Sequence, residues 1–233
     1  MDLTIKEYAD KQQQAILLAD AVAEQLDSAL NKTGKASLAV PGGTTPAPFL
    51  QALASRPLNW DNICITLSDE RQVDADNERS NAKLLRDNFL DHAAAKFQPL
   101  FAGDAGQDSM QNISTALKSG WIPLDVCVLG MGTDGHFASL FPAADQLEQG
   151  LNPQNPEVVI PVTAANIPEP RVSLTLQAIL TAAHIHLLIT GKEKYQVLAQ
   201  AQQNEQTMPA KIELPVQALL RHAGDRLVIH YTN

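Results

Sequence analysis

Four short apolar segments recur along the chain, and a polar turn and a helix-like pattern follow each of them. The segments are KASLAV (35–40), NICITL (62–67), DVCVLG (125–130) and HIHLLIT (184–190). Short strands that alternate with helices are typical of βα units, which build a largely parallel sheet. The sequence therefore predicts an α/β fold of three layers, Rossmann-like, with helices on both faces of the sheet. RLVIHY (226–231) predicts one more strand, at or near an edge.

The helical segments have recognisable ends. Apolar residues recur at three- and four-residue steps from Tyr8 to Leu30, which predicts an amphipathic helix that stops at Gly34. A second helical pattern covers PFLQALA (48–54). Ser80 is placed to cap a third helix, at SNAKLLRDNFL.

Composition and charge limit the classes of function. The chain has 233 residues, of which 45% are hydrophobic, and no charge-rich or Ser/Gly/Pro-rich linker, so we expect one domain over residues 1–233. A formal charge of −9 and a pI near 5.0 provide no general basic surface for nucleic acid or an anionic membrane. No segment approaches the roughly 20 apolar residues of a membrane span. We expect a cytoplasmic monomer, with a dimer as the alternative, that captures any anionic substrate locally.

Cysteine and histidine patterns give no metal site. Cys64 and Cys127 lie far apart in apolar segments, so we expect two small buried side chains, with a disulfide as the weaker alternative. His184 and His186 share one face of their strand, but no third ligand stands at a fitting spacing. A structural role for this histidine pair is favoured, and no metal is expected.

The candidate functional residues lie in the turns after the strands, where open α/β sheets bind their ligands. In VPGGTTP, Gly42 and Gly43 allow backbone N–H groups to approach an anion closely, and Thr44 or Thr45 adds a hydroxyl at the start of the next helix. Such a turn suits a phosphate group. The alternative is a tight βα turn with a threonine cap, and the pattern is neither a Walker P-loop nor GxGxxG.

Charged residues follow the neighbouring strands. Lys194 falls in the first turn of a helix, and Arg171 follows a proline-rich loop. Each alone is typical of a solvated surface, but together with the glycine turn they supply what a dianionic phosphate requires. Asp69 and Arg71 end the NICITL strand and form either a solvated loop with ion pairs or a polar wall of the site. Their position after a strand favours the wall.

The segment GMGTDGHFASLFP (130–142) places a histidine on a glycine-rich turn directly after a strand. A neutral imidazole there can take a proton from water, which makes His136 a candidate general base, although a structural histidine is the alternative. Asp134 orients this histidine, binds substrate or caps the turn. Asp134 and Asp69 are the further candidate catalytic residues.

These motifs resemble those of the 6-phosphogluconolactonases. PGGTTP is similar to the family's GGSTP turn, SDERQVDADNERSN to its DER segment ending in SN, and GMGTDGHFASLFP to its GMGxDGHTASLFP signature. The arginine of PRVSLTL and the GxxK of GKEK fall in the same order, and the resemblance spans roughly residues 36 to 200. The chain departs from the pattern at Thr44, which replaces a common Ser and keeps the hydroxyl, at Phe137, which replaces Thr, and at AAD after LFP, where a glycine is frequent.

The resemblance implies a function and a set of roles. It implies hydrolysis of 6-phosphoglucono-δ-lactone to 6-phosphogluconate, the second step of the oxidative pentose phosphate pathway, without a metal or organic cofactor. It also implies the fold of the glucosamine-6-phosphate isomerases/deaminases. On the matching positions, His136 is the general base and Arg71 a substrate contact, and the sugar-phosphate contacts are Gly42, Gly43, Thr44, Arg171 and Lys194.

Two other functions stay open from the sequence. In the isomerases/deaminases, the similar DGH turn continues to an acidic residue five positions after the histidine, where this chain has Phe141, whereas Asp69 matches the deaminase base. The second alternative is a non-catalytic sugar-phosphate sensor, as occurs when this superfold is attached to a DNA-binding helix-turn-helix. Residues 1–35 are expected to form one long helix and a short entry, which leaves no room for that module.

Overall fold

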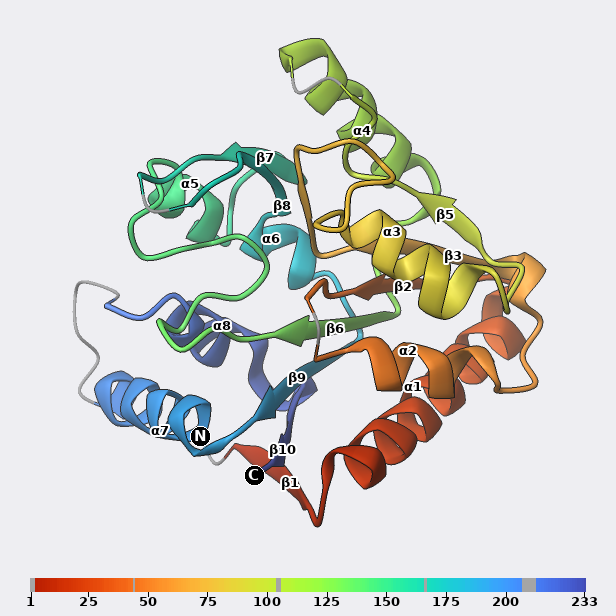
Figure 1. Cartoon of the computed structure of the whole chain (residues 1–233), viewed down its shortest axis with the longest axis horizontal. Coiled ribbons are helices and arrows are strands. Elements are labelled where there is room, and N and C mark those ends of the chain that lie inside the picture. Colours follow the sequence, from red (N-terminus) through yellow and green to blue (C-terminus); the bar gives the residue numbers. More distant parts are fainter. Residues whose placement is uncertain (1–2, 44, 104–105, 166, 207–212) are drawn as a thin grey trace.

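The computed structural model describes residues 3–43, 45–103, 106–165, 167–206 and 213–233. Within these residues, seven strands form one sheet in which every neighbouring pair is parallel. In spatial order the strands are β1 (Thr4–Tyr8), β10 (Leu227–Thr232), β9 (His184–Thr190), β6 (Val126–Gly130), β2 (Ala36–Val40), β3 (Ile63–Leu67) and β5 (Lys96–Gln98). The predicted α/β fold with a largely parallel sheet is confirmed (Figure 1).

The four apolar segments form β2, β3, β6 and β9, which lie together in the sheet and are almost wholly buried. Because these strands are parallel, their carboxyl ends meet along one edge of the sheet. The strand predicted near an edge, β10, lies between β9 and the outermost strand, β1. Strand β1 was not predicted, because its residues are mostly exposed and carry no apolar alternation.

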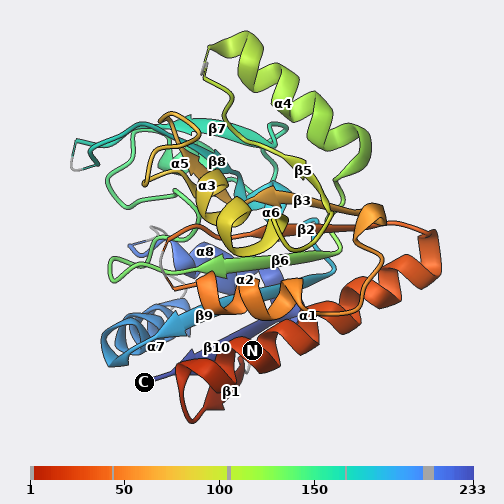
Figure 2. The same ribbon diagram turned by 45° about the vertical axis from the view of Figure 1, so that its right-hand side comes forward.

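Helices cover both faces of this sheet (Figure 1, Figure 2). One group of helices connects strands whose order in the sheet runs toward β5, and the other group connects strands whose order runs back toward β1. Because crossovers between parallel strands are right-handed, the two groups lie on opposite faces of the sheet. The first group is α1 (Lys11–Thr33), α2 (Ala47–Ala54) and α3 (Asn81–Leu85), which continues into the π-helical turn η2 (Arg86–Leu90). The second is α4 (Gln107–Gly120), α5 (Leu147–Leu151), α6 (Leu176–Ile179), α7 (Lys192–Gln206) and α8 (Val216–Ala223). Two 3-10 turns are η1 (Trp60–Asn62) and η3 (Gly224–Arg226).

Local capping fixes two of the predicted helix ends. Helix α1 stops where Gly34 adopts the left-handed conformation (φ 76°) and donates its N–H to the Leu30 carbonyl at 2.8 Å. The Ser80 hydroxyl accepts the N–H of Lys83 at 3.1 Å and begins α3, as predicted. The start of α1 was predicted at Tyr8, but that residue belongs to β1 and the helix begins at Lys11.

A second, three-stranded sheet was not predicted. It consists of β4 (Asp69–Arg71), β8 (Arg171–Leu174) and β7 (Val159–Val162), and both neighbouring pairs are antiparallel. Asp69 and Arg71 were predicted as a polar wall that follows a strand, and Arg171 as a residue after a proline-rich loop, but neither segment was predicted as a strand. Their strand character depends on pairing across about a hundred residues of chain, which local patterns do not show.

Two remaining predictions concern cysteines and membranes. Cys127 is a buried free thiol whose pKa is raised by burial to about 12, whereas Cys64 is free and only partly buried. A buried thiol of this kind is chemically inert and acts as a small apolar side chain. Within the described residues, no helix is both long enough and apolar enough to cross a membrane.

Candidate active site

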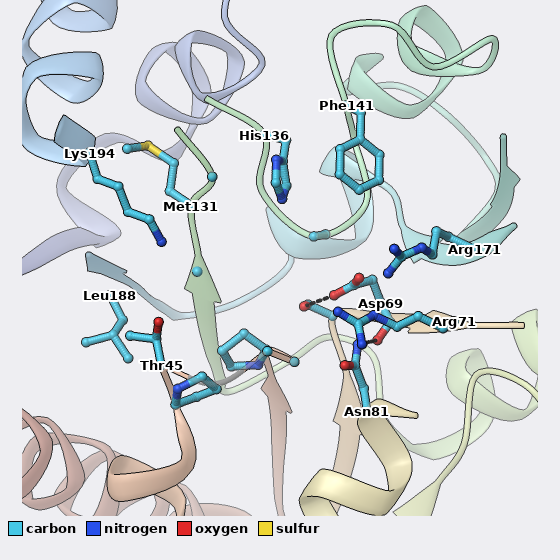
Figure 3. Close-up of a pocket in the computed structure, with 18 residues that line it drawn as sticks. Thr45, Asp69, Arg71, Asn81, Met131, His136, Phe141, Arg171, Leu188 and Lys194 are labelled. Carbon is cyan, nitrogen blue, oxygen red and sulfur yellow. Dashed lines mark hydrogen bonds between the residues drawn. The ribbon is translucent and has the colours of Figure 1, made fainter. Parts of the chain in front are cut away.

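A cavity of about 350 Å³ opens beyond the carboxyl ends of β2, β6 and β9, with β4 and β8 at one side (Figure 3). The structure brings most of the predicted site residues together here. Those that line the cavity are Gly42, Gly43, Asp69, Arg71, His136, Arg171 and Lys194. Asp134 lies behind His136 and contacts it, and Thr44 lies outside the described residues.

The turn after β6 holds His136 at the cavity. The turn closes on itself because the N–H of Gly132 donates to the His136 carbonyl at 2.9 Å. The N–H of Gly135 donates to the Gly132 carbonyl at 3.1 Å, and Gly135 has a φ of 76°, which favours glycine. The glycine-rich composition of this motif therefore serves its tight backbone, and the histidine side chain projects into the cavity (Figure 3).

The His136 ring is held on two sides. Its Nδ1 lies 2.5 Å from Oδ1 of Asp134, which also accepts the backbone N–H of His136 at 3.2 Å. The Phe141 ring packs against the imidazole with a centroid distance of 4.4 Å. Because a carboxylate only accepts hydrogen bonds, the neutral ring carries its proton on Nδ1 and keeps the lone pair of Nε2 free. The nitrogen with the lone pair is the one that a general base requires.

Asp134 is a carboxylate at neutral pH. Burial acts to raise its pKa, but the hydrogen bonds from His136 and the charge of that ring outweigh burial, so the pKa lies below its ordinary value. Gly132 makes room for the pair: a Cβ at that position would lie 2.2 Å from the His136 ring and 2.6 Å from Oδ1 of Asp134. Of the three roles left open for Asp134, orienting His136 is the one that these contacts favour.

The antiparallel sheet sets the two arginines side by side. In the pairing of β4 with β8, Arg71 stands opposite Arg171, and Asp69 stands opposite Ser173. Alternation along a strand turns Asp69 and Arg71 to one face and Glu70 to the other. Asp69 and both arginines line the cavity, and Glu70 does not. Asp69 and Arg71 were predicted as a polar wall of the site, and the pairing of β4 with β8 is what adds Arg171 to that wall.

Arg171 is buried in this wall. Its Nε donates to the Glu169 carbonyl at 3.2 Å, one of its terminal nitrogens lies 3.6 Å from the Glu169 carboxylate, and its guanidinium lies 5.9 Å from the Phe141 ring centroid. Burial, and then the charge of Arg71, hold its pKa below the ordinary value. An arginine stays protonated at neutral pH all the same, so Arg171 is a fixed cation.

Arg71 carries an unused donor. One terminal nitrogen donates to the Arg79 carbonyl at 2.5 Å, but the buried Nε has no hydrogen-bond partner among the described residues. An unpaired buried donor costs about 1–3 kcal/mol. A bound anion or carbonyl oxygen at Arg71 would recover that cost, which supports its prediction as a substrate contact.

The Asp69 carboxylate is already engaged. Its Oδ1 accepts the Ser68 hydroxyl at 3.0 Å and its Oδ2 accepts the Ser139 hydroxyl at 2.6 Å. The backbone N–H of Ser139 in turn donates to the Ser173 hydroxyl at 3.1 Å. These bonds join the strand of Asp69 to the loop that follows His136 and to the strand of Arg171. The contacts suit a residue that positions other groups more than one that exchanges a proton with substrate.

The glycine turn fits against Asn81, a cavity residue that the sequence analysis missed. A Cβ on Gly42 would lie 2.0 Å from the Asn81 side chain, so the close approach requires glycine. Asn81 donates its amide to the Asp69 carbonyl at 2.8 Å. Gly43 has a φ of 88°, which favours glycine for conformational reasons. Thr45 also lines the cavity and is the described hydroxyl at this turn.

Lys194 enters the cavity from α7, on the side opposite Arg171 (Figure 3). The side chain is partly buried, and burial lowers its pKa against the opposing effect of Glu193. Among the residues that the structure describes, none forms an ion pair with Lys194. A desolvated and unpaired ammonium group is well suited to bind an anion.

Glu70, which lies between Asp69 and Arg71, has a structural role. Its carboxylate accepts the backbone N–H groups of Arg71, Asn81 and Ala82, each at 2.7 Å, and the Ser80 hydroxyl at 3.3 Å. Burial raises the pKa of Glu70, and these N–H groups oppose that effect. Glu70 therefore ties the wall that carries Arg71 to the start of α3, which carries Asn81.

The described residues contain no group of three or more His, Cys, Asp or Glu side chains that could hold a metal ion. His186, one of the two histidines weighed as a metal pair, instead bonds His230 and Gln25 in the interior, at 2.9 and 2.8 Å.

The fold and the cavity are those of an α/β protein with a cation-lined site at the carboxyl ends of its strands, and comparison with known proteins identifies the family. The family model described as glucosamine-6-phosphate isomerases/6-phosphogluconolactonase matches residues 9–228. The chain belongs to this family.

Individual proteins with known names are also similar to this chain. A Mesorhizobium japonicum protein named 6-phosphogluconolactonase is 46% identical over 80% of each chain, and a Rhizobium meliloti protein of that name is 42% identical over 92% of each. The crystal structure of a 6-phosphogluconolactonase from Shewanella baltica superposes with a TM-score of 0.91 at 32% identity, over 100% of this chain and 98% of that one. A monomeric glucosamine-6-phosphate deaminase shares the fold, with a TM-score of 0.74 at 19% identity, 99% of this chain and 98% of that one being covered.

Proposed function

We propose that this chain hydrolyses 6-phosphoglucono-δ-lactone to 6-phosphogluconate. The observation that carries the proposal is the imidazole of His136, which Asp134 fixes in the tautomer of a general base at the edge of a cation-lined cavity. The names of the relatives support the same reaction.

We further propose how the site performs this reaction. The glycine turn, Arg171 and Lys194 bind the phosphate, and this tether brings the lactone carbonyl to His136. The Nε2 lone pair removes a proton from a water molecule while the water oxygen attacks the carbonyl carbon. The carbonyl electrons move onto oxygen, and N–H donors of the cavity, the unpaired Nε of Arg71 among them, stabilise the oxyanion.

Collapse of that intermediate completes the hydrolysis. The carbonyl reforms as the bond to the ring oxygen breaks, and the imidazolium of His136 returns its proton to the departing oxygen. Asp134 stabilises the imidazolium between the two steps, because its carboxylate accepts the Nδ1 proton at 2.5 Å. In this scheme Asp69 holds the loop and the arginine wall in register, and it takes no proton.

The same contacts weigh against ammonia release from an amino sugar phosphate. The position that carries an acid in the deaminases holds Phe141, whose apolar ring packs against His136 and cannot transfer a proton. Both oxygens of Asp69, the carboxylate that matches the deaminase base, accept serine hydroxyls. Release of ammonia from glucosamine 6-phosphate would reverse this preference.

We also propose that residues 1–233 act as one domain and as a cytoplasmic monomer. One chain supplies the histidine, the arginine wall, the glycine turn and the lysine around a single cavity, which supports the monomer. A partner subunit is not required to complete this arrangement.

The experiment compares wild type with His136→Ala. Freshly prepared lactone is supplied, and 6-phosphogluconate is followed through a coupled dehydrogenase against the spontaneous decay without enzyme. We expect His136→Ala to lose about 10²–10⁴-fold in kcat, the usual contribution of general-base assistance. The matched control is His92→Ala, since His92 is exposed and lies outside the cavity. A His136→Ala variant with the wild-type rate would refute the role of His136, and a wild type that does not exceed spontaneous decay would refute the proposed function.

A further inference from the structure

The turn that carries Asp134 and His136 is contacted by the segment at the start of α8. The contacts reach the tip of the turn at Gly135, the residue between Asp134 and His136. The N–H of Val216, the first residue of α8, donates to the Gly135 carbonyl at 2.9 Å. The first N–H groups of a helix have no partner within the helix, so this one is available to bind the turn.

Leu214 also packs against Gly135. Its side chain lies against Gly135 so closely that a Cβ there would be 3.1 Å from the Cβ of Leu214. Gly135 also has a left-handed backbone (φ 76°). The tip of the turn therefore rests on one hydrogen bond and one apolar contact, and both come from residues 214–216.

Gln217 fixes that support. Its Oε1 accepts the backbone N–H of Glu213 at 2.9 Å and the N–H of Leu214 at 2.7 Å, and its own N–H donates to the Leu214 carbonyl at 2.9 Å. The side chain is fully buried, at 0% exposure, in a helix that is itself almost wholly buried. One side-chain oxygen thus folds the backbone of 213–214 back onto α8.

We propose that Gln217 is a positioning residue for His136: through Leu214 and Val216 it sets the place of Gly135, and so the orientation of the Asp134–His136 pair. The inference rests on the proposed lactone hydrolysis for its kinetic readout. Gln217 is not among the described residues that line the cavity. Its effect should therefore fall on the chemical step and leave substrate binding unchanged.

The test compares Gln217→Leu, which keeps the approximate size but lacks the acceptor, with Gln217→Glu, which keeps an acceptor oxygen. We expect Gln217→Leu to lower kcat by about tenfold or more with KM within about twofold, since small misplacements of catalytic groups have effects of this size or larger. Gln217→Glu should restore most of the wild-type kcat. Thermal unfolding of each variant confirms that the assayed protein is folded.

The matched control is Ser37→Ala. Ser37 is also buried, and its hydroxyl donates to the Asp125 carboxylate at 3.1 Å and accepts the Asp125 N–H at 3.0 Å. These residues stand at the amino ends of β2 and β6, at the edge of the sheet opposite the cavity. Loss of this buried hydrogen-bonding group should lower stability and leave kcat unchanged.

A second readout is independent of catalysis. The ring signals of His136, assigned by their loss in His136→Ala, are followed by NMR through a pH titration. We expect Gln217→Leu to shift the His136 ring signals, and Ser37→Ala to leave them in place. If wild type hydrolyses no lactone, the proposed function fails while this titration still tests the positioning.

Three results would overturn the inference. One is a Gln217→Leu variant with the kcat and the His136 ring signals of wild type. Another is an equal loss of kcat in Gln217→Leu and Ser37→Ala, which would mark a general effect of destabilisation. The third is an equal loss in Gln217→Leu and Gln217→Glu, which would remove the acceptor oxygen from the explanation.

Discussion

A buried chain of hydrogen bonds outside the active site should make the stability of this protein fall as the solution is acidified. The Tyr8 hydroxyl lies 2.7 Å from Nδ1 of His230, Nε2 of His230 lies 2.9 Å from Nδ1 of His186, and Nε2 of His186 lies 2.8 Å from Oε1 of Gln25. An amide oxygen only accepts, so His186 donates to Gln25, His230 donates to His186, and Tyr8 donates to His230. In this arrangement each imidazole carries one ring proton, as a neutral imidazole does, and the lowered pKa values of both rings agree with it.

The magnitude follows from two depressed pKa values. Burial, and then the charges of His184 and Lys6, lower the pKa of His186 from 6.5 to about 4. Burial, and then His186 and Lys6, lower the pKa of His230 to about 3. Below about pH 6.5 the two histidines bind protons in the unfolded chain but stay neutral in the folded chain. Their contribution to the free energy of unfolding is therefore fully present above that pH and is lost as the pH falls toward about 4.

Between these pH values, each histidine lowers the free energy of unfolding by about 1.36 kcal/mol for every pH unit of acidification. Acidification from about pH 7.5 to about pH 5 crosses roughly 1.5 units of this pH range. The cost is thus about 2 kcal/mol for each histidine and about 4 kcal/mol for the two. A typical domain has only about 5–15 kcal/mol of stability, so this loss is large enough to measure.

The perturbation is the double variant His186→Leu, His230→Leu, measured by urea unfolding at both pH values. The partners left behind, Tyr8 and Gln25, are partly exposed and can bond to water. We expect the double variant to lose about 4 kcal/mol less than wild type on acidification. His92→Leu, at an exposed histidine, should behave as wild type. Equal losses in wild type and the double variant would refute the reasoning.

Three further substitutions test the active site. Asp134→Asn removes the carboxylate that lies 2.5 Å from Nδ1 of His136 and fixes its tautomer. In steady-state kinetics it should lower kcat by about 10²-fold or more with little change in KM. An unchanged kcat would contradict the orienting role of Asp134. Lys194→Met should raise KM about tenfold or more through the loss of a cation, and a KM equal to wild type would exclude Lys194 as a phosphate contact. Gly42→Ala places a methyl 2.0 Å from Asn81 and should raise KM by displacing the glycine turn. The control is Gly120→Ala, where no atom lies within 4 Å of the added Cβ and KM should stay unchanged; equal KM values in the two variants would contradict the role of the glycine turn.

Much of the main sheet could be predicted, because its signals are local. The apolar segments that form β2, β3, β6 and β9 are nearly continuous, as expected of strands buried on both faces. The left-handed end of α1 at Gly34 was visible for the same reason. Since parallel strands end on one edge, the residues after them were expected to share a site, and the structure does gather them around one cavity.

What could not be predicted depends on partners distant in the sequence. The three residues of β4 become a strand only through pairing with β8, and that pairing alone sets Arg71 opposite Arg171. No pattern in the sequence marks His230, yet it bonds a histidine 44 positions away.

Gln217 and Asn81 were passed over for a similar reason. Each lies in an ordinary helical pattern, and neither residue type nor spacing marks its contact with a turn.

The most direct test of the central claim is the rate at which the purified protein hydrolyses freshly prepared 6-phosphoglucono-δ-lactone, measured beside His136→Ala. The account predicts that wild type forms 6-phosphogluconate well above the spontaneous rate, and that His136→Ala loses about 10²–10⁴-fold of the enzymatic rate while still binding the product. Wild-type decay equal to the uncatalysed control would contradict the function. Full activity of His136→Ala would contradict the mechanism.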